Sequence, residues 1–470
     1  MPCKELNDSR ISVKGEYMNL KFTKEKRQET RDMSYGKRFA ALKTTMLTLL
    51  CLSMSLCLYG YSVFNLYLGS DIVNHDARVS ALGGTGVAGG FSFMDSSINP
   101  ANLFFMSEIG TIQIDYSLIK NSESRSLPMW NFFDSYIGQS TYARNENFYN
   151  EISFGGYYTI LKNFKIGASM RPVLNFGADY YEEVRNDLDS NDDKYPPILA
   201  KNFIESKGIL NSGNLLLNWG MPIHDINISI GAELSYYAGT HEYERRIHWT
   251  EDAHELATVV LGDDYLYETK NEIDGIGFKL GLAAQVTERS RIGITYSPKA
   301  SLNSDFSIND QKQDNTSDFI LPSKLRFGFL YMPRNPFRTN FHVDFEMINY
   351  EEIDKFFEDG YAFYVGMEHY VGRAIPFRLG FSHRTAKQDK SIALPTISAG
   401  TGFGIINNLH LDISAEYGIR EYIDLDLFPD SYYDKAGLWR QIRPADRDWS
   451  NPDNVSESFF KIFTSLSYKW

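Results

Sequence analysis

Apolar and polar residues alternate along much of the chain beyond residue 108. The clearest runs have an apolar side chain at every second position: Ile112, Ile114, Tyr116 and Leu118; Ile276, Phe278, Leu280, Leu282, Ala284 and Val286; and Leu325, Phe327, Phe329 and Tyr331. Successive side chains of a β-strand point to opposite faces, so this pattern predicts strands with one apolar and one polar face.

About fourteen such strands are expected. They lie near residues 109–119, 150–161, 164–178, 209–220, 226–240, 273–287, 291–301, 319–332, 339–349, 361–371, 375–386, 391–405, 409–420 and 458–470. A strand that crosses a membrane needs about 9–11 residues, and single-chain bacterial barrels have an even number of strands. The pattern therefore predicts an all-β fold, a transmembrane antiparallel β-barrel over residues 109–470.

The lengths of the connections support a barrel. Short links rich in turn-forming residues fall near 162–163, 222–225, 288–290, 333–336, 372–374 and 407–408. Polar, charged stretches fall between them, at 121–149, 179–208, 241–272, 302–318 and 421–457, and are expected to be loops. Short turns at one end and long loops at the other are typical of outer-membrane barrels. A soluble β-sandwich or propeller also alternates, but its loops need not alternate in length.

Composition and the C-terminus agree with this prediction. The chain is 43% hydrophobic and 14% aromatic, with 30 Tyr and 32 Phe, which suits strands with one apolar and one wet face. Phe460, Ile462, Leu466, Tyr468 and Trp470 share one parity of the last strand. A final strand that ends in an aromatic residue resembles the sorting signal that the outer-membrane assembly machinery reads, so this machinery is an expected partner together with outer-membrane lipid.

The first 62 residues are expected to be an N-terminal extension and a signal peptide. Lys37, Arg38 and Lys43 precede an uncharged apolar run over 46–58, which is short for a membrane-spanning helix. Gly60 and Ser62 are small residues placed for cleavage before residue 63. A membrane-anchoring helix is the alternative, and the length of the run argues against it.

Charge and motifs exclude several functions. Beyond residue 62 the chain has 36 basic and 54 acidic residues, which argues against nucleic acid as a partner. All three cysteines precede residue 63, so no thiolate chemistry is expected beyond it. The sequence contains neither Gly-x-Ser-x-Gly nor His-Glu-x-x-His, and its nine histidines are scattered. We expect no enzymatic activity, no cofactor and no metal site.

Residues 63–108 do not alternate. They contain Gly83, Gly84 and Gly86, then Asp95, then Asn99-Pro100-Ala101. These motifs resemble the N-terminal hatch of the FadL-type outer-membrane long-chain fatty acid transporter family, and most of all an uncharacterised spirochaetal branch related to it. A nucleotide-binding glycine loop is the alternative, but no apolar strand precedes the glycines and no βαβ unit surrounds them.

The resemblance implies a fourteen-stranded barrel plugged by the hatch, which binds hydrophobic ligands in its lumen and releases them sideways through a kinked third strand. Candidates for lining the ligand's path are Phe91, Phe93, Met94, Leu103, Phe104 and Phe105, which pack equally well as the hatch's own core. Arg171 and Pro172 fall within the third predicted strand. Because proline cannot donate to a β-ladder, a lateral opening beside Pro172 is a hypothesis, and a harmless bulge is its alternative.

The resemblance predicts a passive outer-membrane channel for hydrophobic small molecules such as long-chain fatty acids. The alternative is an outer-membrane barrel that works by interaction, as an adhesin or a secretion-associated docking partner. Acidic residues in the predicted loops 179–208 and 241–272 would serve such a role, although acidic runs are more often solvated surface.

Overall fold

The computed structural model describes residues 63–133, 135–185, 198–256, 264–313, 317–334, 338–371, 375–428, 433 and 452–470. The expected signal peptide, the predicted turn at 372–374 and part of the turn at 333–336 lie outside these ranges. None of the described helices is long and apolar enough to cross a membrane.

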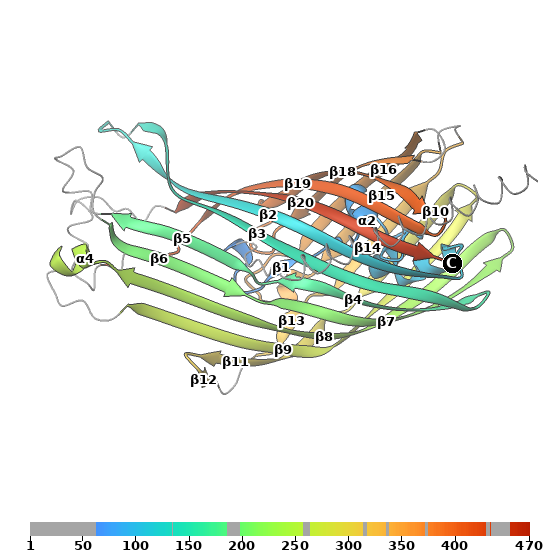
Figure 1. The fold of residues 1–470 in the computed structure, drawn as a ribbon, viewed down its shortest axis with the longest axis horizontal. Helices are drawn as coiled ribbons and strands as arrows, with labels where there is room; N and C mark the ends of the chain where they lie inside the picture. Colours follow the sequence, from blue (N-terminus) through green and yellow to red (C-terminus); the bar gives the residue numbers. More distant parts are fainter. Residues whose placement is uncertain are drawn as a thin grey trace, which may run out of the picture. The chain divides into compact units, whose positions relative to one another are not determined.

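The wall is a closed antiparallel barrel of 14 strand positions, in which β20 pairs with both β19 and β2 (Figure 1). Some positions hold two strands in line, as with β4 and β5. The strands are β2 (Gly110–Trp130), β3 (Tyr136–Leu161), β4 (Phe164–Asn175), β5 (Ala178–Arg185), β6 (Ile198–Lys207), β7 (Ile209–Ile223), β8 (Ile226–Trp249), β9 (Tyr265–Thr287), β10 (Ser290–Ser297), β11 (Ala300–Ile308), β13 (Phe319–Leu321), β14 (Lys324–Tyr331), β15 (Asn340–Ile348), β16 (Gly360–Val371), β17 (Ile375–Thr385), β18 (Ala393–Ile406), β19 (Leu409–Asp424) and β20 (Asp453–Lys469).

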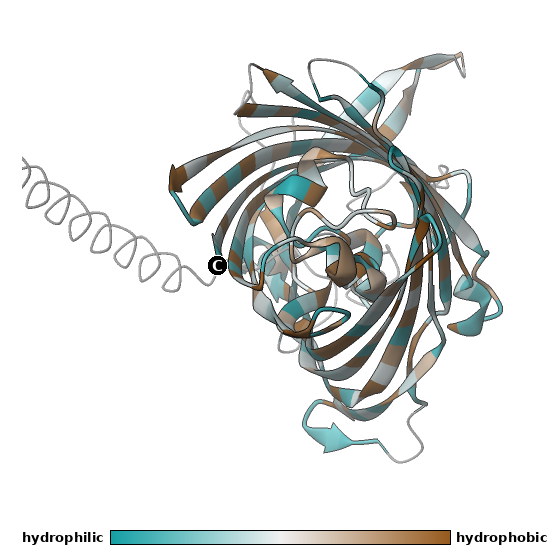
Figure 2. Ribbon diagram, turned by 90° about the vertical axis from the view of Figure 1, so that its right-hand side faces the viewer, coloured by the Kyte–Doolittle hydropathy of each residue, from teal (hydrophilic) through white to brown (hydrophobic). Residues whose placement is uncertain are grey.

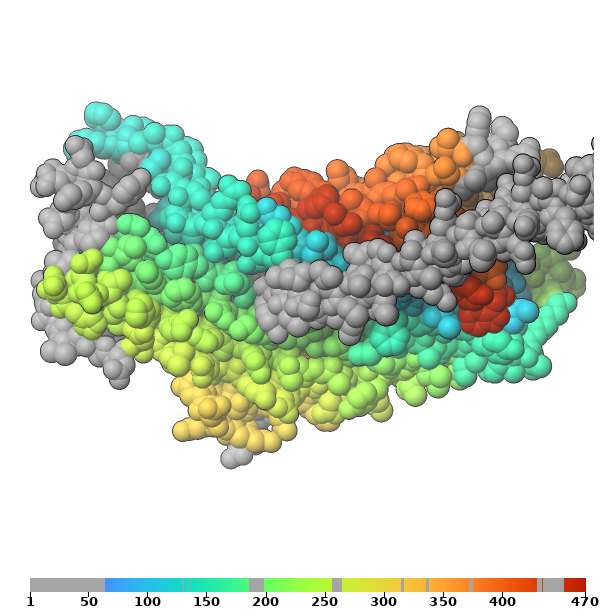
Figure 3. Space-filling model, in the orientation of Figure 1, coloured from blue at the N-terminus to red at the C-terminus, as the bar shows by residue number. Residues whose placement is uncertain are grey.

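The predicted fold class is confirmed, and every predicted strand coincides with a wall position. Parts of the predicted loops 179–208, 241–272, 302–318 and 421–457 lie outside the described residues, and in the described parts the prediction of loops is wrong in large part. β2 and β3 continue through 121–149 as a hairpin that projects beyond the barrel (Figures 1 and 3), and β8 and β9 extend into both ends of 241–272. Outward positions in these extensions are mostly polar, so the apolar outward residues that would reveal the alternation are missing although the strand continues.

The wall is apolar outside and polar inside, the reverse of a soluble protein. On β15, Phe341, Val343 and Phe345 are exposed, whereas the intervening His342 and Asp344 are buried in the lumen. Figure 2 shows the resulting bands of hydropathy along the strands. An apolar outer belt on a closed sheet is what the lipid core of a membrane requires, because such a sheet leaves no unpaired strand edge in lipid.

Residues 63–109 form a hatch inside the barrel (Figures 1 and 2). Its elements are η1 (Val63–Asn65), β1 (Ser70–Asp71), α2 (Ala77–Ala81), α3 (Asp95–Ile98) and η2 (Pro100–Phe105). From α2 onward the hatch contacts β7 to β9 on one side and β17 to β20 on the other. After η2 the chain enters the wall at β2, whose first residue, Gly110, exchanges backbone hydrogen bonds with Trp470.

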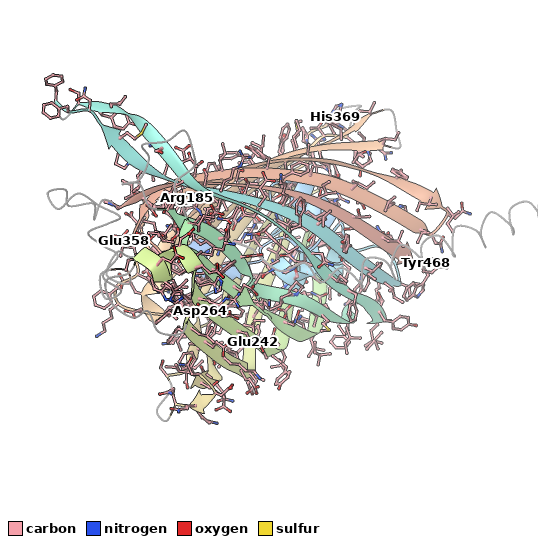
Figure 4. The ribbon with its side chains drawn as sticks, turned by 60° about the vertical axis from the view of Figure 1, so that its left-hand side comes forward. Arg185, Glu242, Asp264, Glu358, His369 and Tyr468 are labelled. Atoms are coloured by element: carbon pink, nitrogen blue, oxygen red, sulfur yellow. The ribbon has the colours of Figure 1, made fainter. Side chains whose placement is uncertain are left out.

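The two ends of the barrel differ. The short-turn end holds the turns at 162–163, 224–225, 288–289 and 407–408, and Tyr468 lies there in Figure 4. The long-loop end holds Arg185, Asp264 and Glu358 in the same view. Three short elements belong to the long-loop end: α4 (Glu251–Leu256), β12 (Gln311–Lys312) and η3 (Tyr350–Glu352).

Candidate functional site

The glycines of the hatch motif allow close contact with the wall. Gly83 has φ +69°, and a Cβ atom there would lie 2.6 Å from the backbone nitrogen of Phe381 on β17. Gly84 also has a positive φ, of +88°. Only glycine adopts this conformation without strain and leaves room for the facing backbone. The motif is therefore a docking surface between hatch and wall.

An ion pair of the wall holds the next turn of the hatch. Asp344 on β15 accepts hydrogen bonds from the backbone N–H groups of Gly86, at 2.8 Å, and Val87, at 3.1 Å. Arg326 on β14 pairs with Asp344 at 3.0 Å and donates to the carbonyl of Gly84 at 2.5 Å. Both charged side chains are almost fully buried. This arrangement fixes the position of the glycine turn.

Asp95 and Asn99 organise the rest of the hatch. The Asp95 carboxylate accepts from the backbone N–H groups of Gly90, Phe91 and Ser92, which closes the preceding loop. Asn99 caps η2 by accepting from the backbone N–H of Ala101 at 3.0 Å. Its amide donates at 2.7 Å to the carbonyl of Val87 within the hatch and at 3.2 Å to that of Leu282 on β9.

Pro100 and Ala101 dock on the same part of the wall. Pro100 is the first residue of η2, where its missing N–H costs nothing. The carbonyl of Ala101 accepts from Ser229 Oγ on β8 at 2.8 Å. Asn99, Pro100 and Ala101 therefore join the hatch to β8 and β9.

The ladder between β3 and β4 ends where the sequence suggested an opening. β4 pairs with β3 only from Phe164 to Met170. Arg171 and Pro172 follow, and the register with β7 shifts between Pro172 and Leu174. Beyond this point β3 and β5 are joined by side chains, because the amides of Asn145 and Asn147 on β3 donate to backbone carbonyls of β5. We call this interrupted edge, from residue 171 of β4 onward, the seam.

The hatch supplies β4 with a replacement neighbour at the seam. Ser70 of β1 pairs with Asn175, and Asp71 pairs with Leu174. The backbone N–H of Ile72 donates to the carbonyl of Val173 at 2.9 Å. β1 therefore closes the seam from the lumen side.

A cavity of about 180 Å³ lies behind the seam and is called here the inner cavity. Its wall is amphipathic. The apolar part includes Ile72, Val173, Leu174, Tyr237, Phe319 and Leu321. Its charged part includes six cations: Arg171, Lys279, Lys324, Arg326, Arg384 and Lys387. An apolar chain with an anionic headgroup matches both parts.

Three of these cations, Lys324, Arg384 and Lys387, gather around Asp71 of the hatch and are called here the cation site. Asp71 lies 3.2 Å from Lys324 and 3.0 Å from Arg384. Lys387 donates to the carbonyl of Gly69 at 3.1 Å. Burial alone would raise the pKa of the Asp71 carboxyl, but the three cations outweigh burial and hold this pKa well below its ordinary value. Asp71 is therefore ionised.

The inner cavity adjoins a larger cleft of about 970 Å³ toward the long-loop end. Leu68, Phe319, Ile320 and Ile353 line both spaces. The cleft also exposes aromatic side chains, including Phe64, Phe306 and Phe357. The two spaces therefore lie side by side between the long-loop end and the seam, and their shared wall is partly apolar.

The six proposed ligand-lining residues lie elsewhere in the hatch, and none is among the described residues that line the inner cavity. Phe93, Met94 and Leu103 form a buried cluster with Tyr157 and Leu216 of the wall. Phe104 and Phe105 contact each other edge to face, and the Arg291 guanidinium lies 3.8 Å from the Phe105 ring centroid. Phe91 lines a polar pocket of about 250 Å³ on the other side of the hatch. Their role toward a ligand stays a prediction.

The sequence did not reveal the cation site or the role of Asp71. The cations come from β14, β17 and the segment after β17, so no local spacing joins them. One feature of the sequence points to it. Lys324 and Arg326 alternate with the apolar Leu325 and Phe327, so their side chains must point to the opposite face of the strand, into the lumen. Among the described residues, no group of three or more His, Cys, Asp or Glu is placed to hold a metal ion.

These features define a transmembrane β-barrel with an N-terminal hatch and an amphipathic cavity between hatch and wall. Three solved structures share the fold: a FadL homologue from Pseudomonas aeruginosa (12% identity, TM-score 0.57, 85% of this chain and 99% of that chain), the toluene transporter TodX of Pseudomonas putida (12%, 0.57, 85% and 99%) and the toluene transporter TbuX of Ralstonia pickettii (15%, 0.52, 87% and 100%). No protein-family model matches the sequence, and no curated protein matches it. The resemblance to the FadL-type family is confirmed at the level of the fold, and the spirochaetal branch stays a prediction.

Proposed function

We propose that this protein is an outer-membrane channel through which hydrophobic small molecules diffuse, and that it is not an enzyme. The amphipathic inner cavity between hatch and wall is the observation that carries the proposal. Two proteins of the same fold are described as toluene transporters, and another as a monoaromatic hydrocarbon channel. A hydrophobic ligand gains on the order of 25 cal/mol for each Å² of apolar surface that it buries in such a cavity.

The ligand enters at the long-loop end, which faces the outside of the cell, and leaves sideways through the seam. The cleft at this end and the inner cavity share lining residues, and the inner cavity reaches Arg171, Val173 and Leu174 of β4. A sideways exit does not require the hatch to leave the barrel. The ligand passes between hatch and wall while the glycine turn stays bound to Asp344 and Arg326. Arg171 and Pro172 mark the start of this exit.

The ligand is an amphiphile with an anionic headgroup, such as a long-chain fatty acid, rather than a neutral hydrocarbon. The cation site lies beside the apolar wall of the inner cavity, where a carboxylate reaches Lys324 and Arg384 while its chain contacts Val173, Leu174 and Phe319. Bonds between charged donors and a carboxylate are roughly twice as strong as neutral ones, so this site selects acids over hydrocarbons.

Uptake of radiolabelled palmitate and toluene tests the proposal in cells whose own fatty-acid channel is deleted. We expect the chain to restore palmitate uptake. A Lys324→Gln, Arg384→Gln variant should lose most of this uptake, whereas Lys312→Gln, which removes an exposed lysine of β12, should keep it. No uptake of either compound contradicts the channel, and uptake of toluene alone contradicts the acid ligand.

The β2–β3 hairpin supports a second candidate function, docking of a partner outside the cell. Phe132 and Phe133 at its tip are 89% and 83% exposed. Large exposed apolar side chains beyond the lipid belt often mark contact sites. If docking is the function, Phe132→Ser with Phe133→Ser should abolish partner binding and leave palmitate uptake unchanged. Loss of uptake in this variant would instead connect the hairpin to transport.

A further inference from the structure

Asp71 of the hatch carries the chemical group that the proposed ligand would bring to the cation site. Its carboxylate contacts Lys324 through one oxygen and Arg384 through the other. Its side chain is 22% exposed and faces the inner cavity. The cation site is thus occupied by a carboxylate that belongs to the chain itself.

The other cations of the inner cavity have carboxylate partners on the wall. Arg171 pairs with Glu233 at 2.5 Å, Lys279 lies 3.5 Å from the same carboxylate, and Arg326 pairs with Asp344. Within the described part of the chain, the ion pairs of Lys324 and Arg384 go to Asp71. Glu346 of β15 also lines the inner cavity, but the direct ion pairs of the cation site come from the hatch, and a ligand carboxylate could replace them.

Asp71 is also one of the two residues of β1, which closes the seam. Its backbone pairs with Leu174 while its side chain holds the cation site, and Ile72 bonds to Val173 immediately afterwards. The bond from Lys387 to the carbonyl of Gly69 ties the same short segment to the cation site. Contacts at the cation site and backbone bonds at the seam thus hold a single stretch of chain, residues 69–72.

We propose, on the basis of the proposed function, that Asp71 is an internal substitute for the carboxylate of the ligand and couples ligand binding to opening of the seam. A ligand carboxylate replaces that of Asp71 at Lys324 and Arg384. The exchange is one anion for another, so the net charge at the cation site does not change. Asp71 then withdraws, β1 leaves β4, and the seam opens beside the bound ligand. A neutral hydrocarbon does not replace the Asp71 carboxylate, so the seam stays closed.

Equilibrium binding to the purified barrel tests the competition. Asp71→Asn should bind radiolabelled palmitate about ten-fold more tightly than the wild type, roughly the effect of one charge-assisted hydrogen bond. Binding of hexadecanol, which has the same chain without the charge, should not change. Asp412→Asn is the matched control, because Asp412 is 21% exposed and pairs with Arg378 on β17, the strand that carries Arg384. This control should bind both compounds like the wild type.

Labelling of a cysteine tests the opening. Ser70 is 4% exposed, so a Ser70→Cys variant should react slowly with a maleimide, measured against the same chain without the substitution. Palmitate should speed the reaction about ten-fold, hexadecanol should not, and adding Asp71→Asn should speed it without any ligand.

Unchanged palmitate affinity in Asp71→Asn, or labelling that palmitate does not alter, overturns the coupling. Such a result leaves the proposed function intact if wild-type cells still take up palmitate. Failure of the wild type to take up palmitate or toluene overturns the proposed function itself.

Discussion

The two halves of the hatch are held in different ways. From α2 to η2, buried side chains of the wall bind the hatch backbone, as Asp344 binds Gly86 and Ser229 binds Ala101. The segment before α2 is held by the short β1–β4 pairing and by ion pairs of Asp71 that face the inner cavity. The contacts that hold the second half are buried hydrogen bonds to side chains of the wall, whereas the ion pairs of Asp71 in the first half are ones that a ligand carboxylate could replace. We infer that the hatch from α2 to η2 stays anchored to the wall. Residues 69–72, which we call the releasable arm, detach from β4 when the ligand binds.

Removing the anchor should have the largest effect. Asp344→Ala leaves Arg326 buried without its partner and should cost about 3–5 kcal/mol of the free energy of unfolding. Leak of a small polar solute should increase as the glycine turn loosens. Unfolding in urea measures the first effect, with Asp305→Ala, in an exposed pair with Lys312, as a control that should cost at most about 1 kcal/mol. An equal loss of unfolding free energy in the two variants would contradict the role of Asp344 as the anchor of the glycine turn.

A change at the docking surface should have the next largest effect. Gly83→Ala introduces a Cβ against the backbone of Phe381 and should destabilise the barrel by about 1–3 kcal/mol. Gly138→Ala on β3 is the control, since its added Cβ would meet nothing within 4 Å. Thermal unfolding compares the two variants, and an unaltered Gly83→Ala barrel would contradict tight docking.

Loss of the Asn99-Pro100 motif should be milder. Asn99→Ala with Pro100→Ala removes the cap of η2 and the bonds to Val87 and Leu282, at a cost of about 0.5–2 kcal/mol for the cap. The barrel should still assemble, while palmitate uptake or solute leak changes. Assembly is read from heat-dependent mobility on a gel. A barrel that fails to assemble would make the motif purely structural.

The smallest effect is expected at the edge of the seam. Pro172→Ala restores one N–H, which lets β4 extend its pairing and should lower palmitate uptake about five-fold, the equivalent of about one hydrogen bond. Pro395→Ala in the continuous β17–β18 ladder should leave uptake unchanged. Faster uptake in Pro172→Ala would contradict an exit at this edge.

The sequence predicted the strands well because the lipid belt imposes a strict period of two, as in residues 276–286 on β9. The prediction of strands failed beyond the lipid belt. Residues 121–149 continue as strands there, but no lipid requires their outward side chains to be apolar. The hatch motif could be proposed from the sequence because its residues fall within one short stretch, 83–101. The cation site was missed because Asp71, Lys324, Arg384 and Lys387 meet only in the closed barrel. β1 has two residues, too few for any period to appear.

A reversible covalent lock on the seam tests the releasable arm most directly. Ser70→Cys with Asn175→Cys places two cysteines at paired positions of β1 and β4, about 5.5 Å apart between Cα atoms if the pair is hydrogen-bonded, a separation that a disulfide can span. Glu421→Cys with Ser456→Cys, a paired position in the continuous β19–β20 ladder, is the control. Oxidation should stop palmitate uptake in the first variant alone, and a reductant should restore it. Full uptake with the β1–β4 disulfide formed would contradict release through the seam.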